Sequence, residues 1–163
     1  MSTNKLTRLS MLLVLGLVLS YLETLIPLNA AVPGIKLGLA NMVTMFVMYR
    51  YEVKDAAVIL LLRVLITGFM FSGLSTIMFG ITGGIFCMTA MSITKKSSHF
   101  SVIGVSVSGA VFHNIGQLVV AYIIMQNQDI LLYYLPYLCV AGIISGVLIG
   151  YVSAFVIERF PDL

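Results

Sequence analysis

Long apolar stretches separated by short polar segments make up almost the whole chain. We expect each stretch to form a helix that crosses a lipid bilayer, since a spanning helix needs about 20 mostly apolar residues. The predicted spans are residues 6–26, 37–49, 56–71, 74–94, 99–126 and 133–157. The second is the shortest, so we expect it to be tilted or joined to the preceding loop. The pattern predicts an all-α integral membrane protein with six transmembrane helices in a single membrane domain, residues 1–163.

The composition agrees with a membrane protein. Hydrophobic residues make up 60% of the chain and charged residues only 9%, and the mean hydropathy is +1.10. A soluble domain has about 25% charged residues. The formal net charge of +3 would suggest nucleic acid as a partner of a soluble chain. Here the basic residues lie at the ends of the apolar stretches, where they fix orientation, so we exclude nucleic acid.

The positions of the basic residues predict the topology. With the N-terminus inside, the inner segments hold seven of the nine: Lys5, Arg8, Arg50, Lys54, Lys95, Lys96 and Arg159. The outer loops hold only Lys36, and Arg63 lies within a span. The positive-inside rule therefore predicts a multi-pass protein of the cell membrane with both termini in the cytoplasm.

Three polar residues lie at the centre of the stretch 99–126: His113, Asn114 and Gln117. Residues three or four apart on a helix lie on about the same face. A polar side chain turned toward hydrocarbon would lose its hydrogen bonds to water without replacement. We therefore expect this face to line protein or a water-filled cavity.

Arg63 lies roughly 10 to 12 Å from the polar connector before its span, at about 1.5 Å per residue. An arginine at such a depth costs at least about 2.5 kcal/mol on insertion scales, so it needs a partner, a wet pocket or a route back to the connector. Glu23, near the end of the first span, either caps a solvent-facing turn or points into the bundle.

Lys36 and Asn41 flank a glycine-rich entry to the second span, and exposed backbone N–H groups beside a lysine suit an anion. The alternative is an ordinary loop with one interfacial lysine. On the predicted topology the polar residues of four spans lie at similar depths in the membrane. This shared depth predicts a pocket open to the outside, with more cationic than anionic groups.

Small residues at four-residue spacing predict close helix packing. Gly16 and Ser20 form such a pair in the first span and Gly80 and Gly84 in the fourth. The glycine stripe of residues 142, 146 and 150 is more typical of a packing groove than of a ligand site.

The sequence carries no sign of catalysis. It has no phosphate-binding loop, no paired aspartates for Mg²⁺ and no recognisable nucleophile near His113. The two cysteines, Cys87 and Cys139, are isolated in apolar runs and provide no metal, haem or iron–sulfur signature. We expect no catalytic residue, no metal and no cofactor.

Four segments carry a resemblance to a known family: residues 33–41 (PGIKLGLAN), 63–65 (RVL), 108–117 (SGAVFHNIGQ) and 134–136 (YLP). With them the chain resembles the heptaprenyl diphosphate synthase component I family, also called the Gx transporter family. That family is similar to the substrate-binding S components of energy-coupling factor (ECF) vitamin transporters. The resemblance implies six spans with inner termini and an outer ligand site made partly by the first loop. It also implies docking to transmembrane and ATPase subunits through span one, here Gly16 and Ser20 where alanines are usual.

These observations lead to one expected function and two alternatives. The first is a non-enzymatic component that captures a small anionic, flavin-, quinone- or isoprenoid-related molecule from outside. Its expected ligand-binding residues are Glu23, Lys36, Asn41, Arg63, His113, Asn114 and Gln117. The alternatives are an accessory membrane subunit of heptaprenyl diphosphate synthase, in isoprenoid and menaquinone synthesis, and a quinone- or flavin-handling component of membrane electron transfer.

Overall fold

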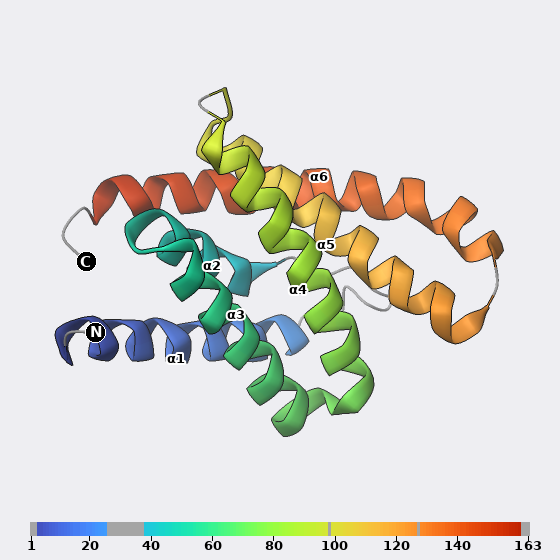
Figure 1. The fold of residues 1–163 in the computed structure, drawn as a ribbon, viewed down its shortest axis with the longest axis horizontal. Helices are drawn as coiled ribbons and strands as arrows, with labels where there is room; N and C mark the ends of the chain where they lie inside the picture. The colour runs from blue at the N-terminus through green and yellow to red at the C-terminus, as the bar shows by residue number, and fades with distance from the viewer. Residues whose placement is uncertain (1–2, 26–37, 98, 127, 161–163) are drawn as a thin grey trace.

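The structure, a computed structural model, describes residues 3–25, 38–97, 99–126 and 128–160, and all its regular elements are helices (Figure 1). They are α1 (Thr3–Leu25), α2 (Leu39–Arg50), α3 (Val53–Thr67), the π-helix η2 (Gly68–Ser72), α4 (Gly73–Lys96), α5 (Val102–Met125) and α6 (Gln128–Arg159). The predicted all-α class is thus confirmed.

Helix α2 forms the centre of the fold. Its residues from Val43 to Met48 are all buried, and the helix packs against α1, α3 and α6. A helix that is apolar on all sides belongs inside a protein. The 12 residues of α2 rise only about 18 Å, which is less than the hydrocarbon thickness of a bilayer. The short second stretch predicted from the sequence therefore corresponds to a short, enclosed helix.

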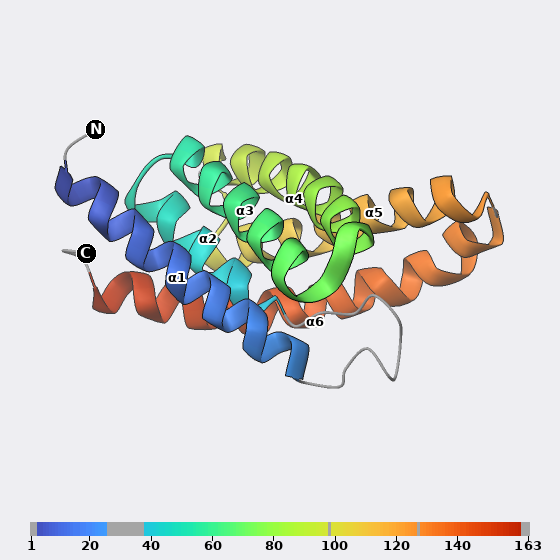
Figure 2. The same ribbon diagram turned by 90° about the horizontal axis from the view of Figure 1, so that it is seen from below.

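Helices α5 and α6 form a long antiparallel pair that extends beyond the other helices (Figure 2). The glycine stripe of α6 lies on α5. A Cβ atom at Gly142, Gly146 or Gly150 would lie 3.1, 2.6 or 2.8 Å from the nearest backbone atom of α5. The predicted packing groove is confirmed, because only glycine permits so close an approach.

Helix α4 lies between α3 and α5 and contacts both through glycines. A Cβ atom at Gly80 or Gly84 would meet the side chains of Val64 and Leu60 on α3. On the α5 side, a Cβ atom at Gly116 would lie 2.9 Å from the Cα atom of Gly83. The turn before α4 is made at Gly73, whose φ of 82° favours glycine.

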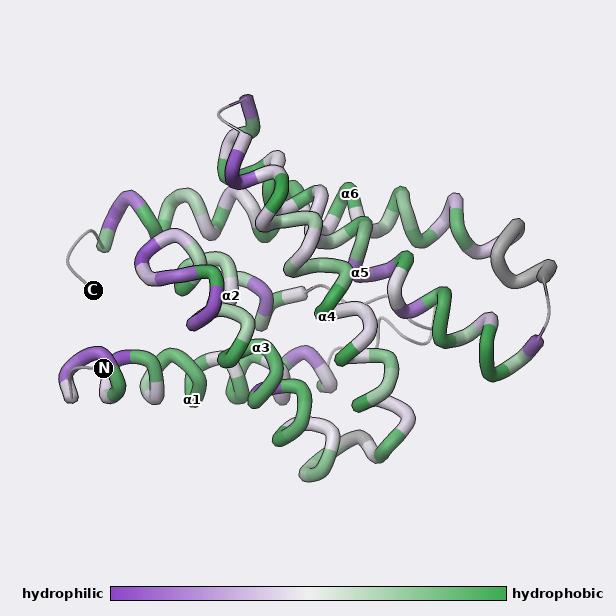
Figure 3. Tube along the Cα trace, in the orientation of Figure 1, coloured by the Kyte–Doolittle hydropathy of each residue, from purple (hydrophilic) through white to green (hydrophobic). Residues whose placement is uncertain are grey.

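The helices are hydrophobic over most of their length, with hydrophilic residues near many helix ends and within α5 (Figure 3). Among the residues that the structure describes, four helices are long and apolar enough to cross a membrane: α1, α4, α5 and the Tyr133–Arg159 part of α6. Their large hydrophobic side chains, such as Met11, Leu74 and Ile144, are exposed, as expected for contact with lipid. The chain therefore has the composition and helix lengths of a multi-pass membrane protein.

Several polar contacts join helix ends at one end of the molecule. Lys5 of α1 forms an ion pair with Asp55 of α3, with 2.7 Å between Nζ and Oδ2. Lys95 of α4 donates to the carbonyl of Met48 in α2, and Arg50 donates to the carbonyl of Ile157 in α6. Basic residues of α1, α2 and α4 thus link the ends of five helices.

The helix bounds differ most from the sequence prediction in the last element. Helix α6 begins at Gln128 rather than near residue 133, so Pro136 lies inside the helix instead of in its first turn. Proline removes one backbone hydrogen bond there. Two residues further along, the Leu138 carbonyl accepts a hydrogen bond from Asn114 of α5.

Candidate ligand site

The site is built around the guanidinium group of Arg63. Its Nη1 donates to Ser20 Oγ on α1, at 3.2 Å, and its Nη2 donates to Asn41 Oδ1 on α2, at 3.0 Å. Arg63 itself lies on α3, so one side chain links three helices. Both acceptors are uncharged. Arg63 therefore has the partners that its depth demands, but the hydrogen bonds themselves leave its charge uncompensated.

Gly16 makes room for this arginine. A Cβ atom there would lie 3.3 Å from Arg63 Cδ, and Ser20 is buried one turn further along the same face of α1. The small pair predicted to dock a partner subunit thus faces the interior of the chain. The outer face of α1 carries large exposed side chains, including Met11 and Val18. The docking role of Gly16 and Ser20 stays a prediction.

Glu23 lies next to this cluster and binds the start of α2. Its Oε1 accepts the backbone N–H of Gly38 at 2.5 Å, and the Gly38 carbonyl accepts the N–H of Asn41 at 2.8 Å. Gly38 has a φ of 80°, which glycine adopts without strain. Glu23 is also close enough to Arg63 to attract its charge. Of the two roles considered for Glu23, the structure favours the inward one.

The polar residues of α5 have different neighbours. Asn114 Nδ2 donates to the carbonyl of Leu138 in α6 at 2.8 Å. The His113 ring packs on α4, where a Cβ atom at Gly83 would lie 2.9 Å from His113 Cε1. Adjacent residues on a helix point about 100° apart, so His113 and Asn114 face different helices rather than one common face. Gln117 is buried, at 8% exposure.

The structure thus brings together Glu23, Asn41 and Arg63, with Ser20 as a further member. Lys36 lies outside the described residues. His113, Asn114 and Gln117 lie on α5, where the contacts of His113 and Asn114 run to α4 and α6. Sequence reasoning missed the role of Ser20 as a partner of Arg63. The signal was available, because a hydroxyl on a neighbouring span is a natural acceptor for a buried arginine.

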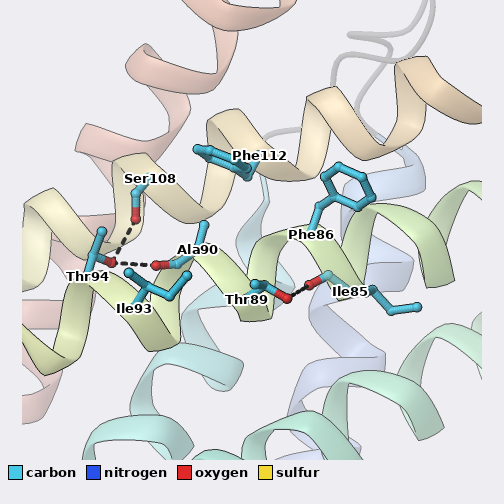
Figure 4. A pocket seen from close by; sticks show the side chains of 8 residues that line it. All are labelled: Ile85, Phe86, Thr89, Ala90, Ile93, Thr94, Ser108 and Phe112. Atoms are coloured by element: carbon cyan, nitrogen blue, oxygen red, sulfur yellow. Dashed lines mark hydrogen bonds between the residues drawn. The ribbon is translucent and has the colours of Figure 1, made fainter.

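A separate groove of about 360 Å³ lies between α4 and α5 (Figure 4). Phe86 and Phe112 line it, and the hydroxyl groups of Thr89, Thr94 and Ser108 are bonded to other groups of α4 and α5. Thr89 donates to the Ile85 carbonyl, and Thr94 is bonded to both the Ala90 carbonyl and Ser108. This groove therefore suits hydrocarbon and offers nothing to a charged group.

The sequence profile of the family described as heptaprenyl diphosphate synthase component I matches residues 12–156. The chain belongs to this family. The match covers α2 to α5, most of α1 and α6, and every residue of the Arg63 cluster, so the resemblance inferred from the sequence motifs is confirmed. No curated protein and no solved structure matches the chain. The family description names one component of a synthase, and it assigns no ligand to the cluster.

Proposed function

We propose that this member of the heptaprenyl diphosphate synthase component I family is a membrane substrate-binding or transport component. It captures a small molecule with an acidic or strongly accepting group from the outer side of the cell membrane. The flavin-, quinone- and isoprenoid-related compounds are the candidate classes. On this proposal residues 1–163 form one membrane domain with six spans, of which α2 is the short, enclosed one, and both termini lie in the cytoplasm.

The observation that supports this function best is the state of Arg63. A cation buried among membrane helices is costly unless an opposite charge accompanies it. The hydrogen bonds of Arg63 go to a hydroxyl and an amide, while the nearby carboxylate of Glu23 is bonded to a backbone N–H. Glu23 supplies a nearby negative charge, but the Nε–H of Arg63 has no acceptor among the described residues, and an anionic ligand would supply one. Lys36, at the entry to α2, would add a second positive charge.

The polar residues of α5 would contribute to the same ligand. His113 and Gln117 would hydrogen-bond its polar atoms. Asn114 would contribute through its Oδ1, since its Nδ2 holds α6. The chain would not act as an enzyme, and partner ECF transmembrane and ATPase subunits would supply the energy for transport.

Native mass spectrometry of the protein purified from its own membranes tests this proposal. We expect a bound small molecule that is retained by the wild type and lost in Arg63→Ala and His113→Ala. Lys96→Ala is the matched control, because it also removes one positive charge but from an exposed helix end. A protein without any retained small molecule, together with unchanged uptake in both variants, would refute the proposal.

The family match favours a second function, an accessory subunit of heptaprenyl diphosphate synthase. On this alternative the basic helix ends, where Lys54 and Lys96 are exposed, bind a soluble synthase component. Combined Lys54→Ala and Lys96→Ala changes would then lower the formation of prenyl diphosphate, whereas Arg63→Ala would not. The reverse pattern would favour ligand capture.

A further inference from the structure

Among the buried polar atoms of the described residues that have no hydrogen-bond partner, two belong to Arg63, which is bonded to Asn41, and to Thr44, about one turn along α2 from Asn41. One is the Nε–H of Arg63, whose Nη2 is bonded to Asn41. The other is the hydroxyl of Thr44, which is only 1% exposed. Thr44 follows Asn41 by three residues on α2, and side chains at this spacing have Cβ atoms about 5–6 Å apart.

Unpaired donors at such depth require an explanation, because native proteins satisfy roughly nine in ten buried polar groups. The Nε edge of a guanidinium is the part that forms two parallel hydrogen bonds with a carboxylate or phosphate. The neutral hydroxyl of Thr44 would add a further donor without adding charge. Together these groups match an oxyanion better than they match a neutral acceptor.

We propose that Arg63 Nε and Thr44 Oγ1 bind an oxyanion, a carboxylate or phosphate group carried by the substrate. This inference rests on the proposed ligand-capture function and specifies its ligand chemistry. Asn41 acts as the positioning residue, since it fixes the guanidinium through Nη2 and adjoins Thr44 on the helix.

The neighbouring charges agree with this assignment. Glu23 is the carboxylate that interacts with Arg63, and its Oε1 is bonded to the Gly38 N–H. Ser20 Oγ on α1 accepts the hydrogen bond from Arg63 Nη1. The Nε edge is thus the part of the guanidinium that the described residues leave without an acceptor.

Nuclear magnetic resonance of the Arg Nε–H groups tests the assignment in full-length protein held in lipid nanodiscs. The chain has four arginines, and Arg63→Lys identifies the Arg63 signal by its loss. We expect acetate or inorganic phosphate to shift this signal saturably, with chloride at equal ionic strength as the control. Tighter binding of acetate would indicate a carboxylate on the substrate, and tighter binding of phosphate would indicate a phosphate group. Equal shifts with chloride, or no saturable shift, would overturn the inference.

A second variant keeps the test independent of Arg63. Thr44→Val preserves shape and removes the hydroxyl, so we expect the affinity for the probe to fall about tenfold. Thr89→Val, at an exposed threonine of α4, is the matched control and leaves the affinity unchanged. Unchanged affinity in Thr44→Val would overturn the role of Thr44. If a native ligand is retained but neither probe shifts Arg63, the oxyanion assignment fails while ligand capture stands.

Discussion

The Arg63 cluster and the α5–α6 pair are both polar regions within apolar helices, but their chemistry differs. In the cluster, side chains bond to side chains across three helices, and donors at Arg63 and Thr44 stay unfilled. In the α5–α6 pair, glycines bring the backbones together and Asn114 bonds to a carbonyl of α6. The bond from Asn114 therefore joins α5 to α6, whereas in the cluster Arg63 Nε and Thr44 Oγ1 have no partner among the described residues.

The largest expected effect follows removal of the charge that defines the cluster. Arg63→Gln keeps a polar side chain but loses the charged fork, so binding of an anionic ligand should weaken by about 2–5 kcal/mol. Native mass spectrometry of the variant, with Lys96→Gln as the charge-matched control, measures the loss. Equal retention in Arg63→Gln and the wild type would break the contrast between the two regions.

The next effect concerns the packing of α5 on α6. In Gly146→Ala the new methyl group would lie 2.6 Å from the Cα atom of Val107, and the backbones must move apart. Such overpacking costs about 1–3 kcal/mol of folding free energy, which a thermal unfolding curve would record.

Gly84→Ala is the control for this variant. Its methyl group would meet only the end of the Leu60 side chain, at 2.5 Å from Cδ2, and that side chain can rotate away. A melting temperature as low in Gly84→Ala as in Gly146→Ala would show that backbone proximity is not the cause.

A smaller effect separates structure from binding on α5. Asn114→Ala removes the hydrogen bond to the Leu138 carbonyl, and such bonds between membrane helices average about 0.6 kcal/mol. We expect a modest fall in thermal stability, with far less loss of ligand than in Arg63→Gln. Complete loss of the ligand at normal thermal stability would show that Asn114 takes part in ligand binding.

The smallest effect is expected at the ion pair between Lys5 and Asp55, outside both regions. The hydrogen bond from Lys5 lowers the pKa of Asp55 below its ordinary value of 3.8. A carboxylate with a lowered folded-state pKa contributes its stabilisation above the unfolded-state value and loses it as the pH falls through the folded-state value. Asp55→Asn should therefore slightly lower the melting temperature at pH 7 and lower it less at pH 2. An equal decrease at both pH values would exclude the ion pair as the cause.

The sequence was most informative where apolar length and small residues decide the structure. The helices near residues 74–94 and 99–126 and the glycine groove of α6 followed from hydropathy and spacing alone. The start of α6 did not, since proline favours the first turn of a helix, whereas Pro136 lies inside α6. The sequence marks α2 as unusually short. Its central position follows from its contacts with three other helices, which the sequence does not show.

The candidate site was predicted only in part. The need of Arg63 for a polar partner followed from its depth in the span, but Ser20 was interpreted as part of a docking surface. The orientation of His113 and Asn114 toward different helices depends on which neighbour each faces, and spacing along one helix does not contain that information. Thr44 gave no signal, because a threonine in an apolar run usually bonds to its own helix.

The most direct test is an experimental density map of the protein purified with its native ligand. The account predicts density for a small molecule within hydrogen-bonding distance of the Arg63 guanidinium, with an acidic group toward Nε and Thr44. Ligand density confined to the α4–α5 groove, with only protein around Arg63, would contradict it.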